Sequence, residues 1–214
     1  MTGRILAIGD IHGCNSRLRQ LLDRVEIDPH ADTLVFVGDY LDRGPDVRGT
    51  IDTLLDIKAT HPDTICLKGN HESMFLNYYR EGLDEALFLY NGGMTTLDSY
   101  GLTLAEARRG RGFPESHLRF LSELPLVHEM EKYFFVHAGA RPGIPLDEQS
   151  PEDLLWIRHE FIESDWDFGR TVVFGHTPLP KPLINRHKIG IDTGAVYGGR
   201  LTCIELPSRK IYQM

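Results

Sequence analysis

The sequence has no long apolar run. No stretch of its 214 residues reaches the roughly 20 apolar residues in a row that a membrane-spanning helix needs. The N-terminus passes from Met1 to Arg4 directly into a short apolar run that soon carries an aspartate, which is not the pattern of a signal peptide. We therefore expect a cytoplasmic protein without a membrane partner.

Cysteine is scarce. The 3 cysteines, Cys14, Cys66 and Cys203, are far apart in the chain and form no C-x-x-C pair. An odd and dispersed set argues against a disulfide framework and against a cysteine zinc site. We interpret all of them as reduced thiols, two of which lie in apolar runs where buried cysteine is common.

Basic residues are fewer than acidic ones. The chain has 23 Lys and Arg against 31 Asp and Glu, which gives a net charge of −8 at pH 7. Because nucleic-acid affinity depends on the neutralisation of phosphates by Lys and Arg, this balance argues against nucleic acid as the main partner. A phosphorylated substrate held by a few local arginines is still compatible with it.

Short apolar runs rich in β-branched and aromatic residues recur along the whole chain. Their length and near-continuous apolar character predict strands that are covered on both faces. Between the first three runs, apolar spacing predicts two amphipathic helices, the first of them capped by Asn15. This alternation indicates an α/β layered fold. The predicted strands cover residues 5–8, 34–37, 64–67, 133–136, 171–174, 189–191 and 201–204.

The segment 72–126 has a different pattern. It shows helical apolar spacing, as at Met74, Phe75, Tyr78 and Tyr79, but no strand-like run. We predict a mostly helical insertion between strands of the sheet. A chain of 214 residues is long enough for one well-buried core, so we expect a single domain over residues 1–214 that contains this insertion.

Polar side chains follow five of the predicted strands. In α/β sheets the crevice beyond the carboxyl ends of the strands is where ligands bind. One such ending could be turn chemistry, but turn chemistry does not account for five of the same type. The endings are Gly9-Asp10-Ile11-His12-Gly13, Gly38-Asp39-Tyr40-Leu41-Asp42-Arg43-Gly44, Gly69-Asn70-His71-Glu72, His137-Ala138-Gly139 and Gly175-His176-Thr177.

The types of donor atom restrict which metal ions can bind. Carboxylate, imidazole and amide oxygen without thiolate suit Mn²⁺, Fe²⁺ or Zn²⁺. Five or six ligand groups exceed what one catalytic ion takes if it also keeps an open position. Two ions that share a carboxylate account for the excess, and such a pair turns water into a nucleophile for displacement at phosphorus.

At these motifs the sequence resembles the phosphoprotein phosphatase family of metallophosphoesterases. The family pattern G-D-x-H-G, G-D-x-x-D-R-G, G-N-H-E, H-A-G and G-H-T is complete and in order between Gly9 and about Gly199. The segments 91–101 and 154–158 are similar to its smaller bacterial and phage branch. The resemblance implies a calcineurin-like β-sandwich of two mixed sheets flanked by helices, two metal ions with Mn²⁺ expected first, and phosphatase activity.

The resemblance also implies roles for single residues. His71 would be the general acid, oriented by Asp42, and Arg43 and Arg158 would clamp the phosphoryl oxygens, for which a guanidinium is well shaped. Glu72 would support the site or begin a helix without binding metal. The implied metal ligands are Asp10 and His12 for a first ion, Asp39 as the bridge, and Asn70, His137 and His176 for a second ion.

The leading hypothesis is hydrolysis of phosphomonoesters, including phosphoserine and phosphothreonine in proteins, by a metal-bridging hydroxide. The chain has no Cys-x₅-Arg loop that would point to a covalent phosphoenzyme. The alternative on the same scaffold is a dinucleoside polyphosphate hydrolase acting on diadenosine tetraphosphate; Asp42 and Glu72 favour the phosphatase because that branch tends to replace both. A catalytically dead scaffold should have lost ligands, and none is missing. No feature of the sequence indicates the oligomeric state.

Overall fold

The computed structural model describes residues 3–214, and its first sheet contains the N-terminal strands. β1 (Ile5–Ile8), β2 (Thr33–Phe36) and β3 (Thr64–Cys66) are parallel neighbours. On the other side of β1 the antiparallel strands β10 (Arg200–Leu206) and β11 (Lys210–Gln213) complete the order β11-β10-β1-β2-β3. The C-terminal part of the chain therefore returns to pair with its beginning.

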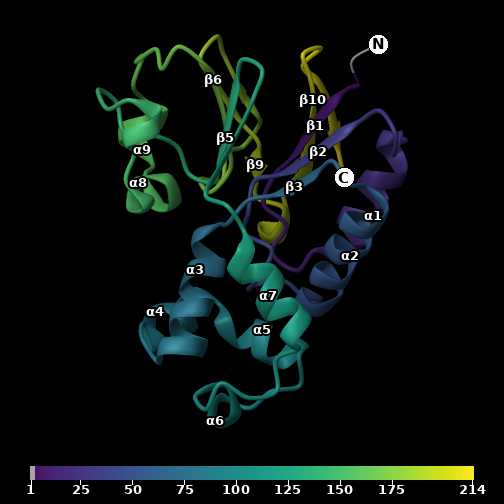
Figure 1. Ribbon diagram of the computed structural model, residues 1–214, viewed down its shortest axis with the longest axis vertical. Helices are drawn as coiled ribbons and strands as arrows, with labels where there is room; N and C mark the ends of the chain where they lie inside the picture. Colours follow the sequence, from purple (N-terminus) through teal and green to yellow (C-terminus); the bar gives the residue numbers. More distant parts are fainter. Residues whose placement is uncertain (1–2) are drawn as a thin grey trace.

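The second sheet is built from later parts of the chain. Its centre consists of the parallel strands β5 (Tyr133–Val136), β6 (Thr171–Phe174) and β8 (Lys188–Gly190). The edges are β4 (Val127–Met130) and β7 (Leu183–Ile184), both antiparallel to their neighbours. Figure 1 shows the two sheets side by side, joined near β9 (Asp192–Thr193), which pairs with β10.

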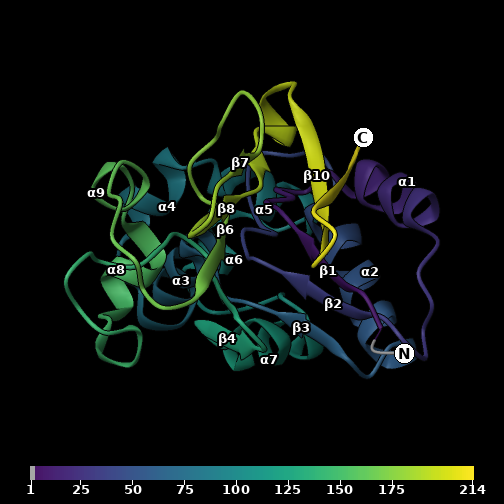
Figure 2. The ribbon, with the colours of Figure 1, turned by 90° about the horizontal axis from the view of Figure 1, so that it is seen from above.

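Alternate residues of each central strand contribute to different cores. In β1, Ala7 belongs to the apolar cluster between the sheets, whereas Leu6 and Ile8 belong to the cluster under the helices. The helices α1 (Asn15–Val25) and α2 (Val47–Thr60) cover that outer face (Figure 2). Both faces of the strands are buried, which is why the sequence shows near-continuous apolar runs. The predicted sandwich of two mixed sheets is thus confirmed.

Between β3 and β4 the chain is helical. An aromatic cluster that includes Phe75, Tyr78, Phe88 and Phe113 fills the interior of this region. Figure 1 places these helices below the two sheets. The elements are α3 (Asn70–Leu76), the π-helical turn η1 (Asn77–Glu81), α4 (Glu85–Tyr90), α5 (Gly93–Ser99), α6 (Leu104–Ala107) and α7 (Glu115–Glu123).

Two short helices lie over the second sheet, between β5 and β6. They are α8 (Pro151–Trp156) and α9 (His159–Ile162). The buried Lys188 of β8 donates hydrogen bonds to the backbone carbonyls of Phe161 and Ser164, at the end of α9. This contact ties α9 to the sheet, because a lysine ammonium satisfies carbonyls that a helix end leaves without partners.

Some local expectations differ from the structure. Asn15 is not the cap of α1: Cys14 occupies that position, and the Asn15 side chain instead bonds to Asp46 and Thr53 of the α2 region. β4 and β11 are not among the predicted strands, because edge strands with alternating polar residues give no continuous apolar run. No helix in the described part of the chain is long and apolar enough to cross a membrane.

Candidate metal centre

The five polar strand endings meet at one place. β1, β2 and β3 run parallel in the first sheet, and β5 and β6 run parallel in the second, so each set ends at a common edge. The residues that follow these strands are all buried, with exposed fractions of 4% or less. They are Asp10 and His12, Asp39 and Asp42, Asn70 and His71, His137, and His176.

One part of the centre joins the two sheets. His137 Nε2 lies 2.9 Å from Asn70 Oδ1, 3.2 Å from His176 Nδ1 and 3.3 Å from Asp39 Oδ1. His176 Nδ1 is also 3.0 Å from Asn70 Oδ1. Ligand atoms that share one ion at a bond length of roughly 2.1 Å lie about 3 Å apart in octahedral geometry. These four side chains therefore have the spacing of a shared ion site.

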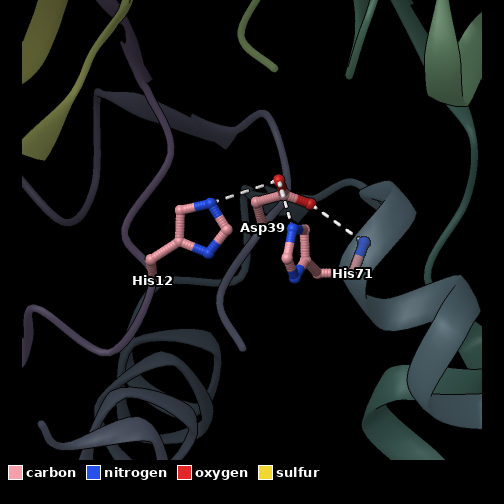
Figure 3. Close-up of side chains that lie close together, drawn as sticks. All are labelled: His12, Asp39 and His71. Carbon is pink, nitrogen blue, oxygen red and sulfur yellow. Dashed lines mark hydrogen bonds and ion pairs between the residues drawn. The ribbon is translucent and has the colours of Figure 1, made fainter. Parts of the chain in front are cut away.

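The other part lies on the far side of Asp39. Figure 3 shows His12 and His71 facing the same carboxylate: His12 Nε2 is 3.4 Å and His71 Nε2 is 3.9 Å from Asp39 Oδ2. The Asp39 oxygens are thus divided, with Oδ1 toward His137 and Oδ2 toward His12. This arrangement suits a carboxylate that bridges two ions.

Asp10 completes the set, and its acidic neighbour Asp192 is not among the predicted site residues. Its Oδ2 accepts a hydrogen bond from the backbone N–H of His176 at 2.9 Å, whereas its buried Oδ1 has no partner among the described residues. Burial and the nearby carboxylates of Asp192 and Asp39 raise the pKa of Asp10 well above its usual value. Asp192 directly follows the apolar run 189–191, so the rule of polar residues after strands could have found it.

The donors fit divalent cations. An orphaned buried carboxylate oxygen and several carboxylates close together are costly without a compensating positive charge. Burial lowers the pKa of His12 to about 3 and that of His176 to about 2, and it also lowers the pKa of His137. These imidazoles are therefore neutral, which is the form that binds metal. His12 Nδ1 and His137 Nδ1 contact backbone carbonyls, which keeps the ring proton on Nδ1 and leaves the Nε2 lone pair for a metal ion.

His71 differs from the other histidines. Its Nδ1 lies 2.6 Å from Asp42 Oδ2, and the other oxygen of Asp42 accepts a hydrogen bond from Thr96 at 2.5 Å. Burial opposes the charged imidazole, but the carboxylates of Asp39 and Asp42 outweigh it and raise the pKa of His71. His71 is therefore the imidazole of the centre that can carry a proton near neutral pH.

Two arginines contact histidines of the centre. Arg43 Nη1 is 2.7 Å from His12 Nε2, and Arg158 donates from Nε to His176 Nε2 at 3.1 Å. Arg158 lies at the start of α9, the helix that Lys188 holds. Tyr197 covers Arg43, whose guanidinium carbon lies 5.5 Å from the centre of the ring. The two guanidinium groups make the region next to the ligands suited to binding an anion.

Glu72 holds the backbone around the ligands. Its Oε2 accepts from the N–H groups of Asp39 and Gly69, each at 2.9 Å, and its Oε1 accepts from those of Tyr40 and Leu41 at 2.8 and 3.1 Å. Burial raises the pKa of Glu72 to about 7, although the backbone donors favour its charged form. Glu72 is fully buried and connects the loop after β2 to the start of α3.

The backbone of the centre is strained. Non-glycine residues rarely adopt positive φ, and such conformations gather at functional sites. Glycines in the motifs make room for side chains: a β-carbon at Gly69 would overlap Asp39 Oδ1, and one at Gly175 would overlap Asp10 Oδ1. The site residues with positive φ are His12, Asp39, Asp42, Arg43 and His176.

Comparison with known proteins identifies the family of the chain. Residues 3–203 match the family described as calcineurin-like phosphoesterase. The chain is 34% identical over 208 residues to serine/threonine-protein phosphatase 1 of Salmonella typhimurium, covering 92% of this chain and 89% of that protein. It is 29% identical over 224 residues to the bis(5'-nucleosyl)-tetraphosphatase PrpE of Bacillus thuringiensis, covering 94% of this chain and 89% of that protein.

A solved structure described as a candidate diadenosine tetraphosphatase superposes with a TM-score of 0.78 at 27% identity, covering 100% of this chain and 94% of that one. A cold-active protein tyrosine phosphatase shares the fold, with a TM-score of 0.69 at 16% identity and coverage of 100% and 80%. The fold and the polar centre define a metallophosphoesterase. The chain belongs to the calcineurin-like phosphoesterase family and is a hydrolase.

Proposed function

We propose that this protein is a dinuclear-metal phosphatase that hydrolyses phosphomonoesters, and in particular phosphoserine and phosphothreonine in cytoplasmic proteins. The observation that carries the proposal is the His71–Asp42 pair, at 2.6 Å, beside the ligand cluster. It supports a positioned proton donor for an ester oxygen, which is a poor leaving group unless it is protonated. The free and buried Cys14, Cys66 and Cys203 are compatible with a reducing compartment.

We assign the metal ligands as Asp10 and His12 for one ion, Asp39 as the bridge, and Asn70, His137 and His176 for the other. When bound, two divalent ions would acidify a water to serve as the nucleophile and would stabilise charge on the phosphoryl oxygens. We propose Mn²⁺ as the working metal, with Fe²⁺ or Zn²⁺ as alternatives, because imidazole and carboxylate donors suit all three.

The remaining residues position the ester and move the proton. Arg43 and Arg158 would hold the phosphoryl oxygens from two sides, since both guanidinium groups already point at the ligand cluster. His71 would give its Nε2 proton to the leaving oxygen while Asp42 keeps Nδ1 protonated and the ring oriented. Thr96 fixes Asp42 by donating to one carboxylate oxygen.

The second candidate is hydrolysis of a dinucleoside polyphosphate. Tyr197 favours it: the ring is 61% exposed and lies over Arg43, so a nucleobase next to the bound phosphate could stack on it. The curated tetraphosphatases to which the chain is similar are also consistent with it. Against it, Asp42 and Glu72 are the residues that the phosphatase branch retains.

A substrate panel separates the two functions. The purified protein is stripped of metal and reloaded singly with Mn²⁺, Fe²⁺, Zn²⁺ or Mg²⁺. It is then assayed on p-nitrophenyl phosphate, a phosphoserine peptide and diadenosine tetraphosphate. We expect metal-dependent release of phosphate from the first two, with Mn²⁺ most effective. A kcat/KM that is highest for diadenosine tetraphosphate would assign the second function instead, and turnover without added metal would contradict both.

A further inference from the structure

A hollow next to the metal centre has no part in the chemistry described above. It lies between the end of α3, the start of α4, and α8, and its volume is about 400 Å³. We call it the α4–α8 groove. In Figures 1 and 2, α3, α4 and α8 lie on the same side of the molecule, away from α1 and α2. The groove is lined by Ser73, Met74, Asn77, Asp84, Leu87, Glu152 and Trp156.

The groove is continuous with the metal centre. The ring of Trp156 meets that of His176 edge-on, with the ring centres 6.1 Å apart. On the opposite wall, Ser73 and Met74 follow His71 on α3. Trp156 and Glu152 also line a second hollow of about 560 Å³ that contains Arg158. A substrate whose phosphate lies between the arginines would therefore extend naturally along this wall.

The charge of the groove is negative. The side chains of Asp84 and Glu152 are exposed, and neither has an ion-pair partner among the residues that the structure describes. Within residues 3–214, the side chain of Asp84 accepts one hydrogen bond, from Asn77 at 3.2 Å, and no lysine or arginine lines the groove. Glu152 also lines the second hollow, where its charge acts on Arg141. Two carboxylates without an ion-pair contact beside a phosphate site still attract a cation and repel further phosphates.

The groove also has apolar surface. Met74 is buried at its floor, Trp156 is half-buried in one wall, and Leu87 is 40% exposed in the other. Further along the chain, Tyr90 at the end of α4 and Met94 in α5 are 90% and 41% accessible. Aromatic and methionine side chains are enriched in surfaces that contact another chain, and the groove offers Trp156 and Met74 of these types.

We propose that the α4–α8 groove binds the peptide chain of a phosphoprotein substrate, with a basic side chain of that peptide placed between Asp84 and Glu152 and an apolar one against Leu87 and Trp156. This inference rests on the proposed protein phosphatase function and adds its sequence preference. A dinucleoside polyphosphate does not fit the groove, because its remaining phosphates would face the same two carboxylates.

The test uses the metal-loaded enzyme and a series of phosphoserine peptides. One arginine is moved position by position along each side of the phosphoserine, and each peptide has a twin with glutamine at that position. For each pair, kcat/KM is measured for the wild type and for the double variant Asp84→Lys/Glu152→Lys, with p-nitrophenyl phosphate as the reference. The control is Asp23→Lys/Asp56→Lys, which makes the same charge change at exposed positions of α1 and α2.

We expect one arginine position to raise the wild-type kcat/KM about tenfold over its glutamine twin, mainly through KM and less so at high salt. In the groove variant this advantage should vanish, whereas the control should keep it. Equal turnover of all twins by the wild type, or an advantage that survives in the groove variant, would overturn the groove assignment alone. Hydrolysis of p-nitrophenyl phosphate without any peptide turnover would overturn the protein phosphatase function and the groove assignment together.

Discussion

His71 and Glu72 are neighbours at the start of α3, but their side chains serve different partners. His71 contacts Asp42 and faces Asp39, where a reacting ester would lie. The Glu72 carboxylate instead accepts hydrogen bonds from four backbone N–H groups. At the scale of the residue, therefore, one side chain is proposed to act on the substrate and the next holds the loop that carries the ligands.

Replacing His71 by Asn should lower kcat on p-nitrophenyl phosphate by roughly 10²–10⁴-fold, because a general acid contributes about that much. Metal content should stay near that of the wild type, since we assign His71 as a proton donor and not as a ligand. Both quantities are measured on the same preparation, by steady-state kinetics and elemental analysis. The matched control is His117→Asn, which removes a buried imidazole outside the centre. Loss of metal along with activity would mean that His71 is a ligand.

Replacing Glu72 by Gln should destabilise the protein by about 3 kcal/mol, because the amide group must turn an N–H toward two backbone donors. Apparent metal affinity should also fall, since the loop that carries Asp39 loses its anchor. Urea unfolding and metal titration measure the two effects. Glu123→Gln, an exposed acid on α7, serves as the control. A Glu72→Gln protein as stable as this control would contradict the anchoring role.

At the scale of the element, α7 is held to the first layer through a buried histidine. Tyr100 shares a hydrogen bond of 2.8 Å with His117 Nδ1, and His117 Nε2 lies 3.1 Å from Asp52 Oδ1 of α2. Arg48 is the other charged group that acts on this imidazole. Burial outweighs the attraction of Asp52 and lowers the pKa of His117. The folded protein therefore binds a proton at His117 less readily than the unfolded chain does.

This sign determines how stability depends on pH. The contribution of His117 should be complete above the unfolded histidine pKa of about 6.5 and should be lost as the pH falls below it, by at most about 1.4 kcal/mol for each pH unit. Urea unfolding at pH 7.5 and at roughly pH 5 should show a smaller decrease in the free energy of unfolding for His117→Asn than for the wild type. Equal decreases in both proteins would assign the acid sensitivity to other groups.

At the scale of the whole molecule, the metal centre joins the two sheets. Asp39 and Asn70 follow strands of the first sheet, and His137 and His176 follow strands of the second. Buried carboxylates and neutral imidazoles from both sides meet where a shared cation would compensate the acidic charge. A bound ion should therefore link the two sheets and stabilise the folded protein.

Loading the metal-free protein with Mn²⁺ should raise its free energy of unfolding by about 2.7 kcal/mol for each ion bound, when the ion is present at 100 times the dissociation constant of that site. Thermal unfolding after chelation and after reloading measures the shift without reference to activity. Asp39→Asn should lose most of it, since this carboxylate faces both halves of the centre. The surface variant Asp23→Asn should keep the full shift, and an Asp39→Asn protein that also kept it would exclude the bridging role.

The sequence by itself determined the class of fold and the residues that meet. Short, near-continuous apolar runs between turn residues predict strands buried on both sides, and polar residues after parallel strands of one sheet share an edge, so Asp10, Asp39 and Asn70 could be brought together before any coordinates. Tertiary structure alone decided the rest. Asp192 joins Asp10, Glu72 reaches four amides and Trp156 faces α3 because chain packing sets those distances. Edge strands such as β11 depend on pairing and not on a local pattern.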